Sequence, residues 1–410
     1  MKLQSCRKLN DGRCVSPEET VSRLEVLLGE RFDYRLLEEH VADHLFWAAF
    51  FLEDDPDFRS MGKGVSAVRS KAGALAEAAE WLGSLNPDTL PGYTAAHQDD
   101  IVDPLRIEDL VSHVATVTPP VLESIKCLNS AKHWADGFSL LSGKTLKVPV
   151  EYVRQIGGPN GRASGNRIEE AIVHATNEIF ERRAHITVLR NRMIIPTIDP
   201  QSITHPIIRK QIETLQARGI DITIKDLSFG ASLPCVGAYF ADPNVSEDVQ
   251  FHHFFKVGAS FDCEEALLRV FTEYTQGRRA NEFGKNVEIE KVDFRRLPTQ
   301  PDETDNFLSA FMFGMVPYRD AEFLRQGEIV PFDPGIRYED CLEDIEAAKE
   351  IARSLGKDYI VVDQTNPDFG FPVVQAIIPG YSDILPYHPA GSPVLFEAWS
   401  REDAMLRLSS

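Results

Sequence analysis

The chain has 410 residues, 43% hydrophobic and 26% charged, a composition that allows an ample core and is too long for one small domain. Its net charge of −20 argues against nucleic acid as the main partner, because phosphate contacts need a surplus of Lys and Arg. No run of 18 apolar residues occurs and the first residues have no apolar core of signal-peptide length, so we expect no membrane span and a cytoplasmic protein.

The pattern of residues 1–58 is rich in charge and predicts a helical N-terminal lead segment. Residues 16–19, with the sequence SPEE, form a good helix start because Ser can cap, Pro suits the first helical position and the second Glu stands at capping-box spacing. His40 and His44 have a spacing that suits zinc. The metalloprotease motif needs Glu where Val41 stands, so we interpret both as helix histidines with ordinary partners.

An acidic pattern recurs three times, each time after a stretch of small residues. The three instances are Glu77-Ala-Ala-Glu80, Glu178-Ile-Phe-Glu181-Arg182 and Glu273-Tyr-Thr-Gln276-Gly-Arg278. The distance from Gly64 to Glu77 is 13 positions, and it is 13 again from Gly165 to Glu178. Repetition of a glycine-then-acidic-helix unit predicts related helices that face one shared site.

Helix geometry gathers the polar residues of the second instance. At about 100° per residue, Asn166, Glu170, Glu178 and Glu181 fall within a sector of roughly 120°, and the aliphatic side chains lie opposite. For a single helix, a solvated acidic face is the simplest interpretation. Like charges at this spacing repel by roughly 0.2–0.5 kcal/mol per pair unless a cation lies between them. Mg²⁺ takes oxygen ligands from carboxylates and nucleotide phosphates, so the repetition favours a metal–phosphate site.

Helix and strand patterns alternate after the second acidic instance. Residues 194–198 predict an extended segment with Pro196 at an edge. Further helices are predicted over 206–217, 262–279 and 339–355, and strands over 222–226, 236–240, 359–363 and 372–378. The fold class is therefore α/β, or α+β, with mixed sheets and helices. We expect a main domain over 59–385 and a C-terminal tail over 386–410.

Other motifs give little support to other chemistries. The segment 137–145, GFSLLSGKT, is similar to a P-loop but has five residues between its glycines instead of four, so we interpret it as a loop. No G-x-S-x-G occurs, so serine hydrolase chemistry has no support. No C-x-x-C pair occurs, and we expect reduced, mostly buried thiols at Cys6, Cys14, Cys127, Cys235, Cys263 and Cys341.

Taken together, the motifs resemble the YcaO family over roughly residues 60–385. The resemblance rests on three strings and their order: Ser60-Met-Gly-Lys63-Gly64 with Ser70 and Glu77-x-x-Glu80; Asn160-Gly-x-Ala-Ser-Gly165-Asn166 with Glu170 and Glu178-x-x-Glu181-Arg182; and Glu273-x-x-Gln276-x-Arg278. The strings Val362-Asp363-Gln-Thr365-x-Pro367 and Val373-Val374-x-x-Ile377-Ile378-Pro379-Gly380 are similar to the family's C-terminal half.

The resemblance implies a cavity that binds ATP and Mg²⁺ without a P-loop and an enzyme that activates a peptide-bond carbonyl. A nucleophile adds to the carbonyl, the resulting oxyanion attacks the γ-phosphate, and phosphate then leaves. An attacking Cys, Ser or Thr of the substrate gives an azoline, and external sulfide gives a thioamide. Turning the amide oxygen into a phosphate leaving group removes much of the barrier.

The resemblance also implies roles for individual residues. Lys63 and Ser70 would contact the nucleotide, Glu77 and Glu80 would line its adenosine or phosphate side, Asn166, Glu170, Glu178 and Glu181 would hold Mg²⁺, Arg182 would touch phosphate, and Glu273, Gln276 and Arg278 would complete the cavity. Trp81 departs from the Arg that often follows the first glutamate pair, which removes one phosphate contact from the expected set.

Two features favour thioamide formation. The final residues lack the proline-rich alternation of many azoline-forming members, and the N-terminal block is similar to stand-alone members linked to thioamidation. The expected partners are a peptide or protein substrate and a TfuA-like protein that handles sulfide, with a homodimer as a further option. An azoline-forming cyclodehydratase and a non-catalytic ATP-binding accessory protein remain the alternatives.

Overall fold

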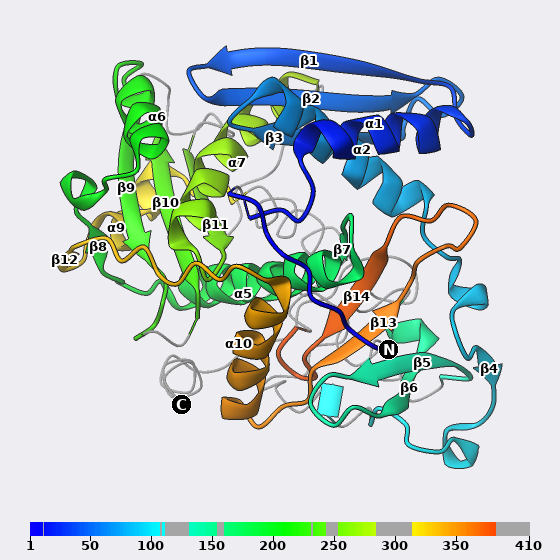
Figure 1. Ribbon diagram of the computed structural model, residues 1–410. Helices are drawn as coiled ribbons and strands as arrows, with labels where there is room; N and C mark the ends of the chain where they lie inside the picture. Colours follow the sequence, from blue (N-terminus) through cyan, green and yellow to red (C-terminus); the bar gives the residue numbers. More distant parts are fainter. Residues whose placement is uncertain are drawn as a thin grey trace.

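In the described part of the chain, three β-sheets and one long helix, α5 (Ile168–Asn191), form the framework (Figure 1). The computed structural model describes residues 1–10, 12–106, 109–110, 131–153, 160–230, 233–242, 253–283 and 314–382, and side chains are described for these except at 190 and 277–283. The predicted tail over 386–410 lies outside the described residues.

The N-terminal layer combines a helix pair with an antiparallel sheet of order β1-β2-β3. Its strands are β1 (Tyr34–Ala42), β2 (Leu45–Leu52) and β3 (Arg59–Gly64), and its helices are α1 (Pro17–Gly29) and α2 (Ala67–Leu82). The predicted start of α1 is confirmed, because the hydroxyl of Ser16 accepts a hydrogen bond from the Glu19 amide at 3.2 Å. Leu24 of α1, Phe50 of β2 and Leu75 of α2 share one apolar cluster.

The helical interpretation of residues 34–52 was wrong. This stretch forms a hairpin in which β2 is buried over most of its length, since its bulky apolar side chains favour a pleated, packed strand over a helix. His40 lies in β1 and stacks on Phe46 with 4.5 Å between ring centroids, while His44 occupies the turn with φ of 56°. The expected boundary at residue 59 falls inside this sheet, because β2 and β3 pair along their length.

The second sheet has the order β11-β10-β9-β8-β12. Its strands are β8 (Thr197–Ile198), β9 (Asp221–Asp226), β10 (Cys235–Ala241), β11 (His253–Ala259) and β12 (Ile329–Val330). The predicted strands over 222–226 and 236–240 are thereby confirmed. So are the neighbouring helices, which are α6 (Pro206–Gln216) and α7 (Cys263–Phe283). His253 is the first residue of β11, and β10 and β11 are buried throughout.

The third sheet is antiparallel, with the order β4-β5-β13-β14-β7 and β6 paired to β5. Its strands are β4 (Thr94–Ala95), β5 (His133–Ser139), β6 (Thr145–Pro149), β7 (Arg162–Ser164), β13 (Ile360–Asp363) and β14 (Val373–Ile377). The P-loop-like segment is the β5–β6 hairpin. Its rejection as a P-loop is confirmed, because Thr145 begins a strand, whereas a P-loop is followed by a helix. The interpretation of the whole segment as a loop was wrong for residues 137–139, which belong to β5.

Helix α5 lies between the second and third sheets and contacts β11, β14 and β7 (Figure 1). Ile172, Ala175 and Ile179 are fully buried on it, as the sequence predicted for its aliphatic face. The predicted helix near the C-terminal end is α10 (Cys341–Ser354), which begins with a capping box between Asp340 and Glu343 and packs on α5. None of the helices in the described ranges has both the length and the apolar character of a membrane span.

Candidate functional site

The three predicted repeats are three strand–helix units: β3 with α2, β7 with α5, and β11 with α7. In each unit a glycine lies where the strand passes against the helix that follows. A Cβ on Gly62 would collide with the backbone of Ser70 and Ala74, and one on Gly258 would lie 2.5 Å from the Ala266 carbonyl oxygen. Glycine therefore allows the strand to pack tightly on its helix, which directs the helix's polar face toward the cavity.

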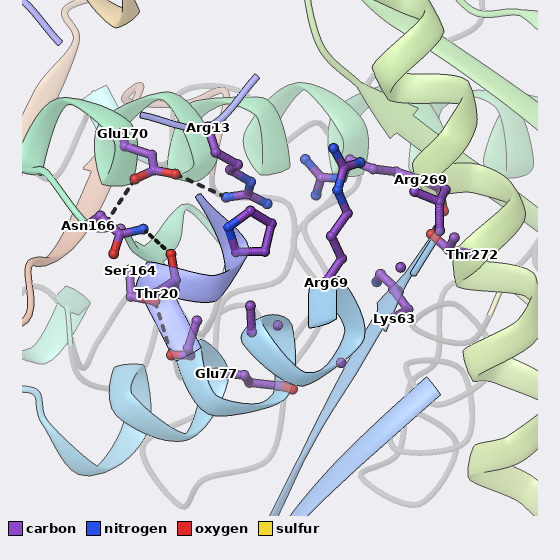
Figure 2. Close-up of a pocket in the computed structure, with 18 of the residues that line it drawn as sticks. Arg13, Thr20, Lys63, Arg69, Glu77, Ser164, Asn166, Glu170, Arg269 and Thr272 are labelled. Atoms are coloured by element: carbon purple, nitrogen blue, oxygen red, sulfur yellow. Dashed lines mark hydrogen bonds and ion pairs between the residues drawn. The ribbon is translucent and has the colours of Figure 1, made fainter. Parts of the chain in front are cut away.

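Two adjoining cavities lie among these units, with volumes of about 360 and 450 Å³. Six residues line both, among them Lys63, Glu77, Arg269 and Gln276. Of the twelve residues predicted from the sequence, nine line at least one cavity: Lys63, Glu77, Asn166, Glu170, Glu178, Glu181, Arg182, Glu273 and Gln276. The polar residues of the three repeats therefore meet at one site (Figure 2).

The carboxylates of α2 are held by backbone amides. Glu77 accepts a hydrogen bond from the Met61 amide at 2.7 Å, and Glu80 accepts one from the Ser164 amide at 3.0 Å. Burial raises the pKa of Glu77, and burial raises the pKa of Glu80 to about 8. Glu80 does not line either cavity and instead joins α2 to β7 from behind the wall.

Two oxygen atoms at the start of α5 lack a hydrogen-bond donor among the described residues. They are Oδ1 of Asn166 and Oε1 of Glu170, both buried, although the Arg13 guanidinium lies 3.5 Å from the Glu170 oxygen. The other oxygen of Glu170 accepts from the Asn166 amide at 2.9 Å, and the Asn166 side-chain amide donates to Thr20 at 3.0 Å (Figure 2). Buried acceptors without donors suit a bound cation.

Farther along α5, Glu178 and Glu181 face the second cavity with Arg182. The Glu178 carboxylate accepts from the Gly161 amide at 3.2 Å and lies 3.7 Å from the Arg182 guanidinium. Burial raises the pKa of Glu178 to about 7, against the opposing effect of Arg182. A carboxylate of this kind favours a bound cation, because the cation replaces the proton that burial would otherwise retain.

Helix α7 closes the site from the opposite side. Glu273 forms an ion pair with Lys63 of β3, and Oε1 of Gln276 is another buried oxygen without a donor among the described residues. The side chain of Arg278 lies outside the described residues. Ser70 is buried and its hydroxyl donates to the Ala67 carbonyl at 2.9 Å, so it does not line the cavities.

The structure adds further cavity residues to the twelve predicted ones: Arg13, Arg69, Lys256, Glu265 and Arg269. Arg13, Arg69 and Arg269 come from the N-terminal segment, α2 and α7, and their side chains point into the same space (Figure 2). Arg269 precedes Glu273 by one helical turn, which is a usable sequence signal. No local signal marks Arg13, because its position depends on how the first residues fold across α5.

Lys256 is buried on β11 of the second sheet, and it lines the second cavity. Burial, together with the nearby charges of Lys63 and Arg182, lowers the pKa of Lys256 to about 7. Near neutral pH its ammonium is therefore poised between the charged and neutral forms.

In the described part of the chain, no three His, Cys, Asp or Glu side chains lie close enough to hold a metal ion alone. Mg²⁺ does not require such a cage, since it is commonly bound by one or two carboxylates, waters and nucleotide phosphates. The carboxylates and the oxygen acceptors of Asn166 and Gln276 fit this mode of binding, and the surrounding guanidinium groups fit phosphate.

The family model described as the ATP- and Mg²⁺-binding YcaO cyclodehydratase matches residues 61–382. The chain belongs to the YcaO family. The matched range contains all twelve predicted residues, and the expected cofactors, ATP and Mg²⁺, are those of the family.

Relatives of this YcaO protein are found among curated proteins. An uncharacterised protein of Methanothermobacter thermautotrophicus is 27% identical over 333 residues, covering 78% of this chain and 80% of that protein. The ribosomal protein S12 methylthiotransferase accessory factor YcaO of Escherichia coli is 26% identical, covering 59% and 39%. An uncharacterised protein in the tfuA 3′ region of Rhizobium leguminosarum bv. trifolii is 25% identical, covering 60% of each. The last two matches span less than two thirds of the curated proteins.

Solved structures share the fold. YcaO from Methanopyrus kandleri bound with AMPPCP and Mg²⁺ has a TM-score of 0.66 at 18% identity, covering 92% of this chain and 95% of that chain. A heterocyclase in complex with substrate and cofactor has a TM-score of 0.70 at 21% identity, covering 93% of this chain and 54% of that chain. The predicted α/β fold of the YcaO type is thereby confirmed.

Proposed function

We propose that this YcaO protein uses ATP and Mg²⁺ to activate a backbone amide of a peptide or protein substrate. One observation carries the proposal: three strand–helix units bring basic side chains and buried oxygen acceptors without donors into one site. Guanidinium groups suit phosphate and oxygen acceptors suit Mg²⁺, so this combination fits a metal-bound triphosphate.

The basic residues would bind the phosphates. Arg13, Arg69 and Arg269 converge from three segments, and Arg182 adds a fourth guanidinium in the adjoining cavity. The Lys63 ammonium would contact the nucleotide, either in place of its ion pair with Glu273 or in addition to it. These side chains neutralise and orient the phosphates, which is most of what phosphoryl transfer requires of a protein.

The acidic and amide side chains would hold Mg²⁺ together with phosphate oxygens. We assign this role to Asn166, Glu170, Glu178 and Glu181, with Glu77 and Gln276 beside them. When bound, the metal supplies charge neutralisation at the transferred phosphoryl group. Glu80 would act as a positioning residue that fixes α2 against β7, and Ser70 would support the wall from inside α2.

The reaction would begin when a nucleophile adds to the amide carbonyl carbon. The carbonyl oxygen, now an oxyanion, takes the γ-phosphoryl group and releases ADP, and it later leaves as inorganic phosphate. The chain's part is to hold the carbonyl oxygen and the phosphorus in line and to keep bulk water out, because water would otherwise take the phosphoryl group.

We further propose that sulfide is the nucleophile and a thioamide the product, with a TfuA-like protein as partner. The relative in the tfuA 3′ region supports this choice. The test incubates the protein with ATP, Mg²⁺, isotope-labelled sulfide and a randomised peptide library. Exchange of one oxygen for labelled sulfur, dependent on ATP, supports the proposal.

Azoline formation is the second candidate, because the fold is shared with a heterocyclase. In the same experiment, ATP-dependent loss of water without uptake of label would select cyclodehydration and contradict the thioamide proposal. ATP binding without peptide-dependent turnover would instead indicate a non-catalytic accessory protein.

A further inference from the structure

Lys256 places an unpaired ammonium in the wall of the second cavity. The residue is only 7% exposed. Among the described residues, no acceptor lies within hydrogen-bond or ion-pair distance of the ammonium, whose one contact there is with the Phe254 ring, 5.3 Å from its centroid. A buried charge is costly unless it is paired, so a partner for Lys256 is expected to enter through the cavity.

Two other lysines show how this protein pairs an ammonium internally. Lys225 of β9 is fully buried and donates to the Thr197 hydroxyl at 2.8 Å and to the Gln326 carbonyl at 2.5 Å. Lys63, which also lines the second cavity, forms an ion pair with Glu273. Lys256 is as enclosed as these two and has neither kind of partner in the described part of the chain.

Strand β11 directs the Lys256 side chain toward α7. Side chains alternate along a strand, so Lys256 faces the same side as Phe254 and the Gly258 position. Phe254 packs edge-on against Tyr274 of α7, and a Cβ on Gly258 would meet the Ala266 carbonyl oxygen of the same helix. The polar residues of α7 line the cavity that Lys256 lines, so the ammonium projects into the space between strand and helix.

Basic groups from three strand–helix units meet around this space. Lys63 belongs to β3, Arg182 to α5 and Lys256 to β11, and all three line the second cavity. Burial, Lys63 and Arg182 lower the pKa of Lys256, and the Glu181 carboxylate opposes them. Like charges in an enclosed space repel, so an anion with several charged oxygen atoms fits between these groups.

The walls of the two cavities indicate which part of a nucleotide each would hold. The first cavity includes the apolar side chains of Val65, Leu268 and Phe371, which suit a nucleoside. In the described part of the second wall, Met61 and Ala163 are apolar and the other residues are polar or charged. That wall suits the end of a triphosphate, where phosphoryl transfer requires charge neutralisation.

We propose that Lys256 contacts the terminal phosphoryl group of ATP in the second cavity and holds it during transfer. The inference rests on the proposed function, because it takes ATP as the phosphoryl donor. The amide oxyanion forms a bond to the γ-phosphorus, the bond from this phosphorus to the bridging oxygen breaks, and its electron pair leaves with ADP. Lys256 donates a hydrogen bond to a non-bridging oxygen throughout and neither gains nor loses a proton.

The first experiment compares Mg·ATP with Mg·ADP by calorimetry, using the full-length protein without peptide. Lys256→Met replaces the ammonium with an uncharged side chain. It is expected to lower the affinity for Mg·ATP about tenfold or more and that for Mg·ADP less than about twofold, because ADP lacks the terminal group. Lys210→Met is the matched control, since Lys210 is a half-exposed lysine of α6 paired with Asp43 at 3.4 Å, and it should bind both nucleotides normally.

Two results of this comparison would overturn the proposal. One is an unchanged affinity of Lys256→Met for Mg·ATP. The other is an equal loss of affinity for both nucleotides, because that would show that Lys256 shapes the cavity instead of contacting the terminal group. Circular dichroism of each variant verifies the fold.

The second experiment uses the wild type alone and so remains decisive if Lys256→Met does not fold. Brief treatment with acetic anhydride near neutral pH acetylates neutral amines, and mass spectrometry maps the modified lysines. Saturating Mg·ATP is expected to protect Lys256, and Mg·ADP is expected to leave it reactive. Lys210 should react equally with either nucleotide. Equal modification of Lys256 under Mg·ATP and Mg·ADP would contradict the proposed contact.

The outcome can be distinguished from failure of the proposed function. If Lys256→Met binds both nucleotides as the wild type does while the wild type modifies peptides with ATP, the role of Lys256 is wrong and the function stands. If Lys256 distinguishes ATP from ADP while no peptide is modified, the contact with the terminal phosphoryl group stands and amide activation is wrong.

Discussion

The Glu80 carboxylate accepts a hydrogen bond from the Ser164 amide at 3.0 Å, which joins α2 of the first strand–helix unit to β7 of the second. Burial raises the pKa of Glu80 in the folded protein to about 8, against about 4.3 for a Glu in an unfolded chain. Burial at this junction therefore favours the protonated form, although the hydrogen bond from Ser164 favours the charged one.

This relationship predicts a pH-dependent stability. The stabilisation that Glu80 gives by retaining its proton is complete below about pH 4.3 and is lost as pH rises through about 8, because the unfolded chain releases that proton earlier. Glu80→Gln keeps an acceptor for the Ser164 amide but carries no charge. Between pH 6 and 8.5 we expect the melting temperature of the wild type to fall more than that of Glu80→Gln, by a difference on the order of a few degrees. If the melting temperatures of the two proteins change by the same amount between pH 6 and 8.5, the raised pKa of Glu80 is wrong.

A second prediction concerns the acids of α5. Glu178→Gln and Glu181→Gln should each lower the affinity for Mg·ATP about tenfold or more, equal to about 1.4 kcal/mol, because each removes a charge that faces the second cavity. Calorimetry measures the affinity, and circular dichroism shows that the fold is retained. Glu346→Gln, an exposed glutamate of α10, is the matched control and should bind normally. Unchanged binding in both variants would remove these residues from the site.

The arginine cluster leads to a third prediction. Arg69→Gln and Arg269→Gln should weaken ATP binding by about 1.5–3 kcal/mol each, the usual value of a hydrogen bond to a charged group. Binding of adenosine, which has no phosphate, should change little. Comparing the two ligands by calorimetry isolates the phosphate contribution, and the exposed Arg353 provides the control substitution. An equal loss for both ligands would indicate that the arginines shape the pocket instead of binding phosphate.

A fourth prediction tests the tight strand–helix packing. Gly62→Ala places a Cβ against the backbone of Ser70 and Ala74, which cannot yield as a flexible side chain can, so we expect a loss of roughly 1–3 kcal/mol in the free energy of unfolding. Gly29→Ala is the control, because no atom lies within 4 Å of a Cβ there. Denaturant unfolding measures the free energy of unfolding of both variants. Equal values would show that β3 and α2 can move apart without a loss of stability.

Much of the fold could be predicted because its signals are local. A few neighbouring residues are enough to predict the cap at Ser16, the acidic helices and the apolar strands over 236–240 and 372–378. The hairpin over 34–52 was missed because charged residues of β1 mask its alternation, and its strand character depends on β2 packing against α2.

The residues of the site also fall into those that local sequence predicts and those that it does not. Helical periodicity alone brought Asn166, Glu170, Glu178 and Glu181 to one face, since that spacing is fixed by 3.6 residues per turn. Whether that face meets solvent or a cavity is a different matter. Arg13, Cys14 and Lys256 reach the site from other segments, and no local pattern reports contacts across such sequence separations.

By itself, the sequence determined the helix start at Ser16, the main helices and strands that follow the second acidic instance, and which helix faces carry acid. Only the tertiary structure decided that these faces meet, that the first residues cross α5 to place Arg13 and Cys14 beside Glu170, and that Ser70 and Glu80 lie behind the wall. The reason is physical: backbone geometry acts over a few residues, whereas burial and contact between distant segments depend on how the whole chain packs.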